Sequence, residues 1–270
     1  MNLGTLNLTA LDPSLLGWPL LAGLLVLATH VPLGQRVLAR GIIFLDLAIA
    51  QIAVLGVIAA HAFELAPQGW PTQLAAAAAA LAGAAGLALC ERRWPEIQEA
   101  LIGSTFVVAA SLSVLLLAGD PHGSEHLSEL LTGQILWATP MQVAQIGALY
   151  LVLLGLWAWQ GNRSAGGLGT FGFYLIFALA ITASVQLVGV YLVFASLILP
   201  ALAVRHLAPR QGVLVGWTLG ALAYAAGLAA SAWFDWPAGP AIVIALALFS
   251  LLSGNGLRLL QSGDSASIRP

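Results

Sequence analysis

Lysine is absent from this chain of 270 residues, and cysteine occurs once, at Cys90. The phosphate loop G-x-x-x-x-G-K-(S/T) depends on its lysine, so the chain cannot hydrolyse ATP through such a loop. A single cysteine excludes an intramolecular disulfide and any metal site that needs several cysteines. We therefore expect no nucleotide or thiol chemistry in the chain itself, and any energy must come from another subunit or from an ion gradient.

Charge is also scarce, whereas apolar side chains are abundant. Charged residues make up 7% of the chain and hydrophobic residues 60%, and the mean hydropathy is +0.95. One soluble core could not enclose this much apolar surface, so membrane lipid must cover the surplus. The net charge of −2 and the lack of a basic patch outside short loops argue against a nucleic-acid partner.

Long apolar runs recur along the chain with short polar breaks between them. A spanning helix needs about 20 mostly apolar residues, and the residue alternation of a transmembrane barrel is missing. The sequence predicts an all-α, polytopic membrane bundle with about nine segments, near 14–33, 41–62, 70–90, 99–118, 140–159, 171–186, 188–204, 212–234 and 238–257. The sixth and seventh share one apolar stretch, which fits two short helices that meet near 186–189 or a re-entrant hairpin.

The basic residues indicate an orientation. All nine fall in loops on one side of the predicted segments: Arg36, Arg40, Arg92, Arg93, Arg163, Arg205, Arg210, Arg258 and Arg269. Because cationic loops are retained in the cytoplasm, the N-terminus is predicted outside and the C-terminus inside. We expect one transmembrane domain over 1–270, with 1–13 as a retained external N-terminus. Residues 253–270 are expected to be soluble and flexible, with 259–270 as a cytoplasmic tail.

Four segments resemble one known family. LVGVYLVFASLILPALAVR at 187–205 is similar to a V-G-x-L-L-V-x-A-L-L-I-x-P-A-x-x-A-R pattern, and FDWPAGPAIVIALALF at 234–249 to D-x-P-x-G-P-x-I-V. LSELLTGQILWATP at 127–140 resembles L-x-x-L-x-G-x-L-L-x-V-(S/T)-P, and PLGQRVLARG at 32–41 adds to the similarity. In this order and spacing, the segments resemble the permeases of ATP-binding-cassette importers that serve zinc, manganese and iron uptake.

The resemblance implies a fold, an assembly and a location. It implies a type II importer-like permease in the bacterial cytoplasmic membrane, present as a homodimer, with a cytoplasmic ATPase that holds the ATP and an extracytoplasmic metal-binding protein. The chain itself would bind no cofactor, because the divalent metal is its substrate. Pro200, Arg205, His206 and Arg210 would belong to a coupling segment, a short cytoplasmic helix that docks on the ATPase. The same loop also obeys the positive-inside rule.

Two polar residues in the second segment are candidates for the substrate route. The family pattern G-D-x-L-x-H-A-x-L-P-G corresponds to LDLAIAQIAVLG at 45–56, where the histidine position falls on Gln51 and Asp46 lies one residue before the family aspartate. Ionisable groups at membrane depth usually face a bundle interior or a water path. The alternatives are that Asp46 extends toward Arg40 at the interface and that Gln51 makes a hydrogen bond between helices.

The loop between the fourth and fifth segments is a candidate surface site for transient metal binding. Asp120, His122, Glu125 and His126 place two imidazoles and two carboxylates within seven residues, a ligand set that zinc and similar ions prefer. The alternative is a solvated loop with Ser124 as the N-cap of a helix that starts near His126.

Other function classes stay open at this point. A gradient-driven secondary transporter of small metabolites would need an inverted repeat and buried coupling groups. A related importer permease for vitamins or iron chelates, or a membrane scaffold, is also compatible with the composition. The importer permease for a divalent transition metal, zinc first, is the hypothesis that accounts for the four segments.

Overall fold

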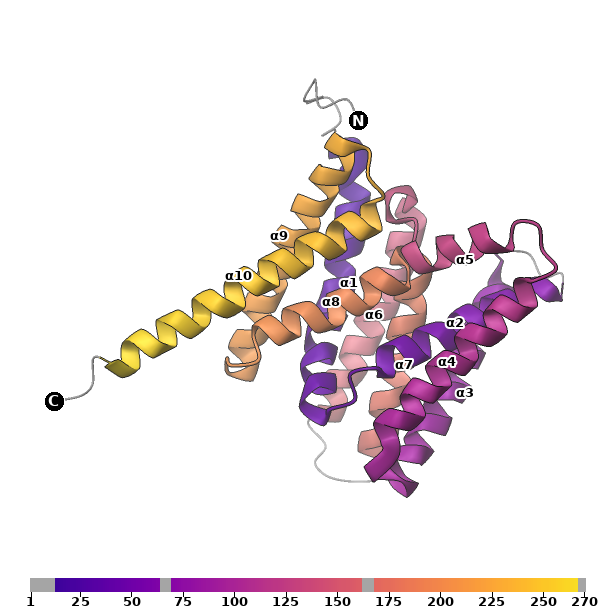
Figure 1. Cartoon of the computed structure of the whole chain (residues 1–270), viewed down its shortest axis with the longest axis horizontal. Coiled ribbons are helices and arrows are strands. Elements are labelled where there is room, and N and C mark those ends of the chain that lie inside the picture. The colour runs from indigo at the N-terminus through magenta and orange to yellow at the C-terminus, as the bar shows by residue number, and fades with distance from the viewer. Residues whose placement is uncertain (1–12, 64–68, 162–167, 267–270) are drawn as a thin grey trace.

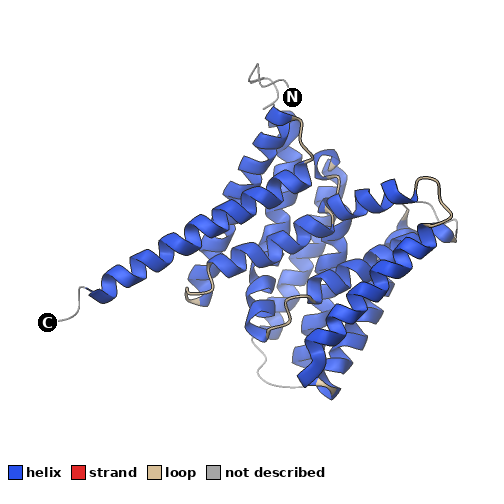
Figure 2. Cartoon of the chain, viewed as in Figure 1, coloured by secondary structure: helices blue, strands red, loops and turns tan. Residues whose placement is uncertain are grey.

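The computed structural model describes residues 13–63, 69–161 and 168–266, and within these ranges every regular element is helical (Figures 1 and 2). Two 3₁₀ turns, η2 (Pro95–Ile97) and η3 (Ile135–Trp137), precede α4 and α6. The α-helices are α1 (Pro13–Arg40), α2 (Leu45–Ala62), α3 (Trp70–Arg93), α4 (Gln98–Leu117), α5 (Gly123–Thr132), α6 (Pro140–Gly161), α7 (Leu168–Val188), α8 (Val190–Ala203), α9 (Pro209–Phe234) and α10 (Ala238–Ala266). The predicted all-α class is confirmed.

The apolar helices follow the predicted order of membrane segments. In the described part of the chain, seven helices are long and apolar enough to cross a membrane: α1, α2, α3, α4, α6, α7 and α9. Two shorter apolar helices, α8 and the first part of α10 (Ala238–Ser253), take the places of the seventh and ninth predicted segments. The additional helix α5 lies in the connection between the fourth and fifth predicted segments.

The shared apolar stretch of the sixth and seventh segments forms two helices of unequal length. α7 has 21 residues and α8 has 14, and they meet at Gly189, inside the predicted range 186–189. Gly189 adopts a φ of 81°, a conformation that interrupts a right-handed helix and that suits glycine because it has no Cβ. Figure 1 shows α8 turning away from the direction of α7 after this break.

α9 packs closely against α1 through a stripe of glycines spaced four residues apart. A Cβ added to Gly212, Gly216 or Gly220 would collide with one side chain of α1, namely Gln35, Val31 or Leu27, respectively. The residue numbers rise along α9 while those of the contacted α1 residues fall, so the two helices run antiparallel in a regular register. Small residues permit this approach, which matters in lipid because the hydrophobic effect does not drive helices together there.

α2 and α7 form the most enclosed part of the bundle. α2 packs on α3 and α4 on one side and also contacts α7 and α8. Its buried apolar residues, including Leu45, Ile49 and Val54, belong to one continuous core cluster with α7 residues such as Phe177 and Ile181. The polar residues Asp46 and Gln51 of α2 are therefore surrounded by protein.

The connections gather at two ends of the bundle. In Figure 1 the α1–α2, α3–α4 and α8–α9 connections lie toward the lower side of the bundle, and the α4–α5 and α9–α10 connections lie toward the upper side. Arg40, Arg93 and Arg205 belong to the lower set. We call this lower set the basic end of the bundle.

The structure describes part of the predicted C-terminal segment but not the predicted N-terminal one. Residues 1–12 of the predicted external N-terminus lie outside the described residues. The segment at 253–270, predicted to be flexible, is helical as far as Ala266, because α10 continues to that residue. The assignment of 259–270 as a cytoplasmic tail stays a prediction. No proline occurs between Pro240 and Pro270, so every residue of α10 after Pro240 keeps the backbone N–H that a helical hydrogen bond needs.

Candidate functional site

Asp46 lies in the first turn of α2 and has no exposed surface. Neither of its carboxylate oxygens has a hydrogen-bond partner among the described residues. The alternative that Asp46 extends toward Arg40 does not hold, because Arg40 lies 3.9 Å from the carboxylate of Glu91 instead. A buried carboxylate that lacks a partner is unfavourable unless a cation or a proton compensates its charge.

Gln51 is the second candidate on α2, and its side chain is 5% exposed. Its Oε1 atom has no hydrogen-bond partner among the described residues, so a hydrogen bond between helices through this oxygen does not account for it. Five residues at 100° per residue place the Asp46 and Gln51 side chains about 140° apart around the helix axis. The two residues therefore share a helix but not a face.

The α4–α5 connection brings together only some of the residues of the predicted surface metal site. Asp120 Oδ1 accepts a hydrogen bond from the backbone N–H of His122 at 2.9 Å, and Asp120 Oδ2 lies 3.4 Å from His126 Nδ1. Nowhere in the described ranges do three or more His, Cys, Asp or Glu side chains gather closely enough to hold a metal ion. Glu125 is exposed and lies outside this contact.

The local helix start explains that pairing. α5 begins at Gly123, with His122 at the N-cap position, so the prediction of Ser124 as the N-cap of a helix starting near His126 is wrong. The Gly123 N–H donates to the Asp120 backbone carbonyl at 3.0 Å, and the His126 N–H donates to the His122 carbonyl at 3.0 Å. Because of this tight turn the helix starts before Ser124, and the His126 side chain lies close to the Asp120 carboxylate.

The α8–α9 turn presents the predicted coupling residues at the basic end. Arg205, His206 and Arg210 are exposed, whereas Pro200 is buried inside α8. Val204 anchors the turn because it is 1% exposed, and the N–H of Leu207 donates to its carbonyl at 2.9 Å. The predicted separate coupling helix is not formed: the chain passes directly from this turn into α9, whose first residue is Pro209.

A family model supplies the deciding comparison, because it matches residues 13–162 and 168–255 and is described as the ABC 3 transport family. The chain belongs to the ABC 3 transport family. The predicted family, the metal-ion permeases of ATP-binding-cassette importers, is thereby confirmed.

One solved structure has a similar fold. It is described as PsaBC from Streptococcus pneumoniae in complex with Fab, and it superimposes with a TM-score of 0.73. The two chains are 22% identical, and the match covers 91% of this permease and 94% of that chain. The similarity extends over both chains and shows a shared fold.

Buried polar pairs that the sequence did not reveal connect helices inside the permease. The hydroxyls of Tyr150 on α6 and Ser184 on α7 form a short hydrogen bond, and those of Ser196 on α8 and Tyr224 on α9 lie 2.8 Å apart. His30 on α1 is fully buried and contacts the Val26 carbonyl through Nδ1 at 2.9 Å. The two hydroxyl pairs satisfy polar atoms of neighbouring helices that lipid or an apolar core could not. The His30 contact lies within α1, and its Nε2 atom has no hydrogen-bond partner among the described residues.

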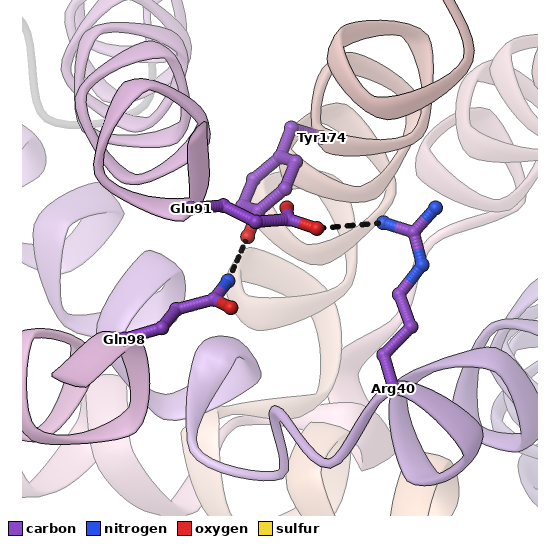
Figure 3. Close-up of polar contacts among 4 residues, drawn as sticks. All are labelled: Arg40, Glu91, Gln98 and Tyr174. Atoms are coloured by element: carbon purple, nitrogen blue, oxygen red, sulfur yellow. Dashed lines mark hydrogen bonds and ion pairs between the residues drawn. The ribbon is translucent and has the colours of Figure 1, made fainter. Parts of the chain in front are cut away.

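A second polar group, also missed, ties four helices at the basic end of the permease (Figure 3). Arg40 at the end of α1 pairs with Glu91 on α3, and Gln98 at the start of α4 donates to the Tyr174 hydroxyl on α7 at 2.7 Å. Tyr174 lies between Glu91 and Gln98 in the close-up. The Arg40 guanidinium also lies 4.3 Å from the centre of the Phe173 ring.

The sequence contained one signal for this second group. Arg40 and Glu91 each lie near the polar end of an apolar run on the same predicted side of the membrane. Charges at that depth require a partner or solvent, so each of the two residues was a candidate for an ion pair, although the sequence does not show with which partner.

Proposed function

We propose that this permease carries a divalent transition metal ion across the bacterial cytoplasmic membrane, with zinc as the first candidate and manganese or iron as the alternatives. The observation that carries the proposal is Asp46, a fully buried carboxylate on a membrane helix that has no hydrogen-bond partner in the described part of the chain. A passing divalent cation would gain an oxygen ligand and a compensating negative charge there. Zinc ranks first because the exposed Asp120–His126 pair offers the nitrogen and oxygen ligands that zinc prefers.

The energy for transport would come from a separate cytoplasmic ATPase. The chain has no lysine and no phosphate loop of its own. The exposed α8–α9 turn with Arg205, His206 and Arg210 is the surface on which that partner would act. Two permease copies would act as a homodimer, and closure of two ATPase subunits would switch the permease between outward and inward states.

The orientation follows from the basic end. If arginine loops are retained in the cytoplasm, the α8–α9 turn would lie inside and the α4–α5 connection outside. An extracytoplasmic metal-binding protein would then deliver the ion to the face that carries Asp120 and His126. The ion would pass through the bundle near Asp46 and Gln51 without covalent chemistry.

Reconstitution tests the proposal. The permease is incorporated into liposomes with its partner ATPase, and uptake of radiolabelled zinc and manganese is measured with and without ATP. ATP-dependent uptake that is lost in Asp46→Asn, together with no uptake by the permease alone under a proton gradient, is the expected result. Metal accumulation by the permease alone under a proton gradient would instead identify a secondary transporter.

A further inference from the structure

A cavity of about 330 Å³ lies in the half of the bundle nearest the basic end. Its walls come from the later part of α1, the end of α6, the first half of α7 and the start of α9. The floor includes Leu33, Leu153 and Ile176, which are all buried, and the mouth includes Ala158 and Trp217. None of these residues belongs to the candidate route on α2.

The lining of this cavity is suited to a hydrocarbon ligand. Thr29 contributes a hydroxyl, which donates to the Val26 carbonyl at 3.1 Å instead of facing a ligand freely. The indole N–H of Trp217 donates to the Leu27 carbonyl at 3.1 Å, so its ring presents an apolar surface at the mouth. An apolar pocket without free polar groups does not retain water well and favours an apolar occupant.

The mouth opens onto a face that is already adapted to lipid. On α6, beside the mouth, Leu151 is 74% exposed and Leu156 is 44% exposed, and Trp217 on α9 is 38% exposed. α6 and α9 are both long enough to cross the membrane. Acyl chains of the surrounding bilayer therefore have direct access to the cavity.

Arg36 adds a positive charge at the end of the cavity that lies nearest the membrane surface. It lies three residues after Leu33 and four after Pro32, which both line the cavity, so it is one turn further on the same side of α1. The guanidinium lies 4.0 Å from the centre of the Trp157 ring, and Trp157 is itself a wall residue. The cation and the apolar cavity are thus physically continuous.

The charge on Arg36 has no counter-ion among the described residues. No carboxylate among the described residues lies within ion-pair distance of Arg36, whereas Arg40, one turn further, is paired with Glu91. Two like charges four residues apart on a helix repel each other. An external anion at Arg36 would therefore be favourable.

We propose that this cavity binds one acyl chain of an anionic phospholipid whose headgroup phosphate contacts Arg36. A basic side chain near the membrane surface attracts anionic lipid, and the adjoining apolar cavity would convert that general attraction into a defined site. The site would hold one lipid in the groove between α6 and α9, on the floor formed by α1 and α7.

Native mass spectrometry of the purified permease tests this proposal. Bound phosphatidylglycerol and phosphatidylcholine are counted for the wild type, for Arg36→Gln and for Ala158→Phe, which fills the mouth. Arg93→Gln is the matched charge control, since Arg93 lies 5.9 Å from the Trp94 ring centre and away from any described cavity. Ala148→Phe is the matched size control, because Ala148 is exposed on the same helix but does not line the cavity.

The wild type is expected to retain phosphatidylglycerol about fivefold better than phosphatidylcholine, the ratio typical of one basic side chain at an anionic surface. Arg36→Gln should abolish this preference, Ala158→Phe should reduce retention of both lipids, and the two controls should behave like the wild type. Equal retention by Arg36→Gln and wild type would overturn the headgroup contact. If Ala158→Phe changed the oligomeric state and left lipid retention unaltered, the groove would be an interface between permease copies and the proposal would be wrong.

Discussion

Gly133 and Gly189 lie backbone against backbone at the point where the end of α5 meets the break between α7 and α8. Gly133 has φ 73° and ψ 170°, and Gly189 has φ 81° and ψ 162°. Both values lie in a region of backbone conformation that is essentially restricted to glycine. A Cβ on Gly189 would lie 2.7 Å from the Gly133 Cα, so neither residue has room for a side chain. This contact joins two of the four segments that resemble the metal-permease family.

We predict that Gly189→Ala strongly destabilises the permease. The substitution combines backbone strain of about 1–3 kcal/mol with a clash against the Gly133 backbone, which cannot move aside as a side chain would. Thermal unfolding in detergent measures the effect as a lower midpoint temperature and a smaller folded fraction after purification. Gly155→Ala is the control: Gly155 is in α6, a Cβ there meets nothing within 4 Å, and alanine favours helix by about 0.5–1 kcal/mol. A Gly189→Ala variant as stable as the control would show that the contact is dispensable.

The order of the apolar helices could be predicted from the sequence because composition determines which segments enter lipid. The contacts between them could not. Arg40 and Glu91 are 51 residues apart, and each reads by itself as a charge at the end of a span, so their pairing depends on how α1 and α3 pack. The same holds for Tyr150 and Ser184, whose polar atoms meet only because α6 and α7 are neighbours. At the α4–α5 connection the sequence places two imidazoles and two carboxylates close together along the chain, but the turn at Gly123 brings only Asp120 and His126 into contact.

We predict that the α4–α5 connection lies outside the cell and the α8–α9 turn inside. Cysteine is placed at Ser124 or at Arg210, both exposed, in a background that carries Cys90→Ala. An impermeant thiol reagent added to intact cells should label the cysteine at position 124 and should reach position 210 only after the membrane is opened. The opposite pattern would reverse the orientation inferred from the arginines and would move the proposed entry face to the other side.

We predict that the α8–α9 turn transmits the action of the ATPase. Arg205→Glu combined with His206→Glu reverses the charge of an exposed surface and leaves the anchor Val204 in place. ATP-driven metal uptake should fall at least tenfold while the amount of folded permease stays unchanged, because a charge reversal at an interface costs binding energy without disturbing the core. Ser128→Glu, an exposed change on α5 at the other end, should leave uptake normal. Wild-type uptake in the double variant would place the coupling surface elsewhere.

Substitutions in the α4–α5 connection and substitutions of the buried polar residues of α2 should change different kinetic parameters of metal uptake. His126 and Asp120 lie on the surface, where a weak site raises local metal occupancy without changing the conformational cycle. His122→Ala combined with His126→Ala should therefore raise the metal concentration needed for half-maximal uptake and leave the maximal rate near that of the wild type. Asp46→Ala should instead lower the maximal rate, since a partly dehydrated cation inside the bundle would lose an oxygen ligand and a compensating charge.

Uptake of radiolabelled zinc and manganese at matched expression separates these two effects. Gln51→His, which introduces the histidine that the family pattern has at this position, is expected to shift the preference toward zinc, because imidazole nitrogen is a better zinc ligand than an amide oxygen. Glu125→Gln is the control for the outer loop, since Glu125 is exposed and lies outside the Asp120–His126 contact. Wild-type kinetics in the double histidine variant would reduce the outer loop to a structural turn. An unimpaired Asp46→Ala would remove the carboxylate from the route, and the buried charge would then need a structural explanation.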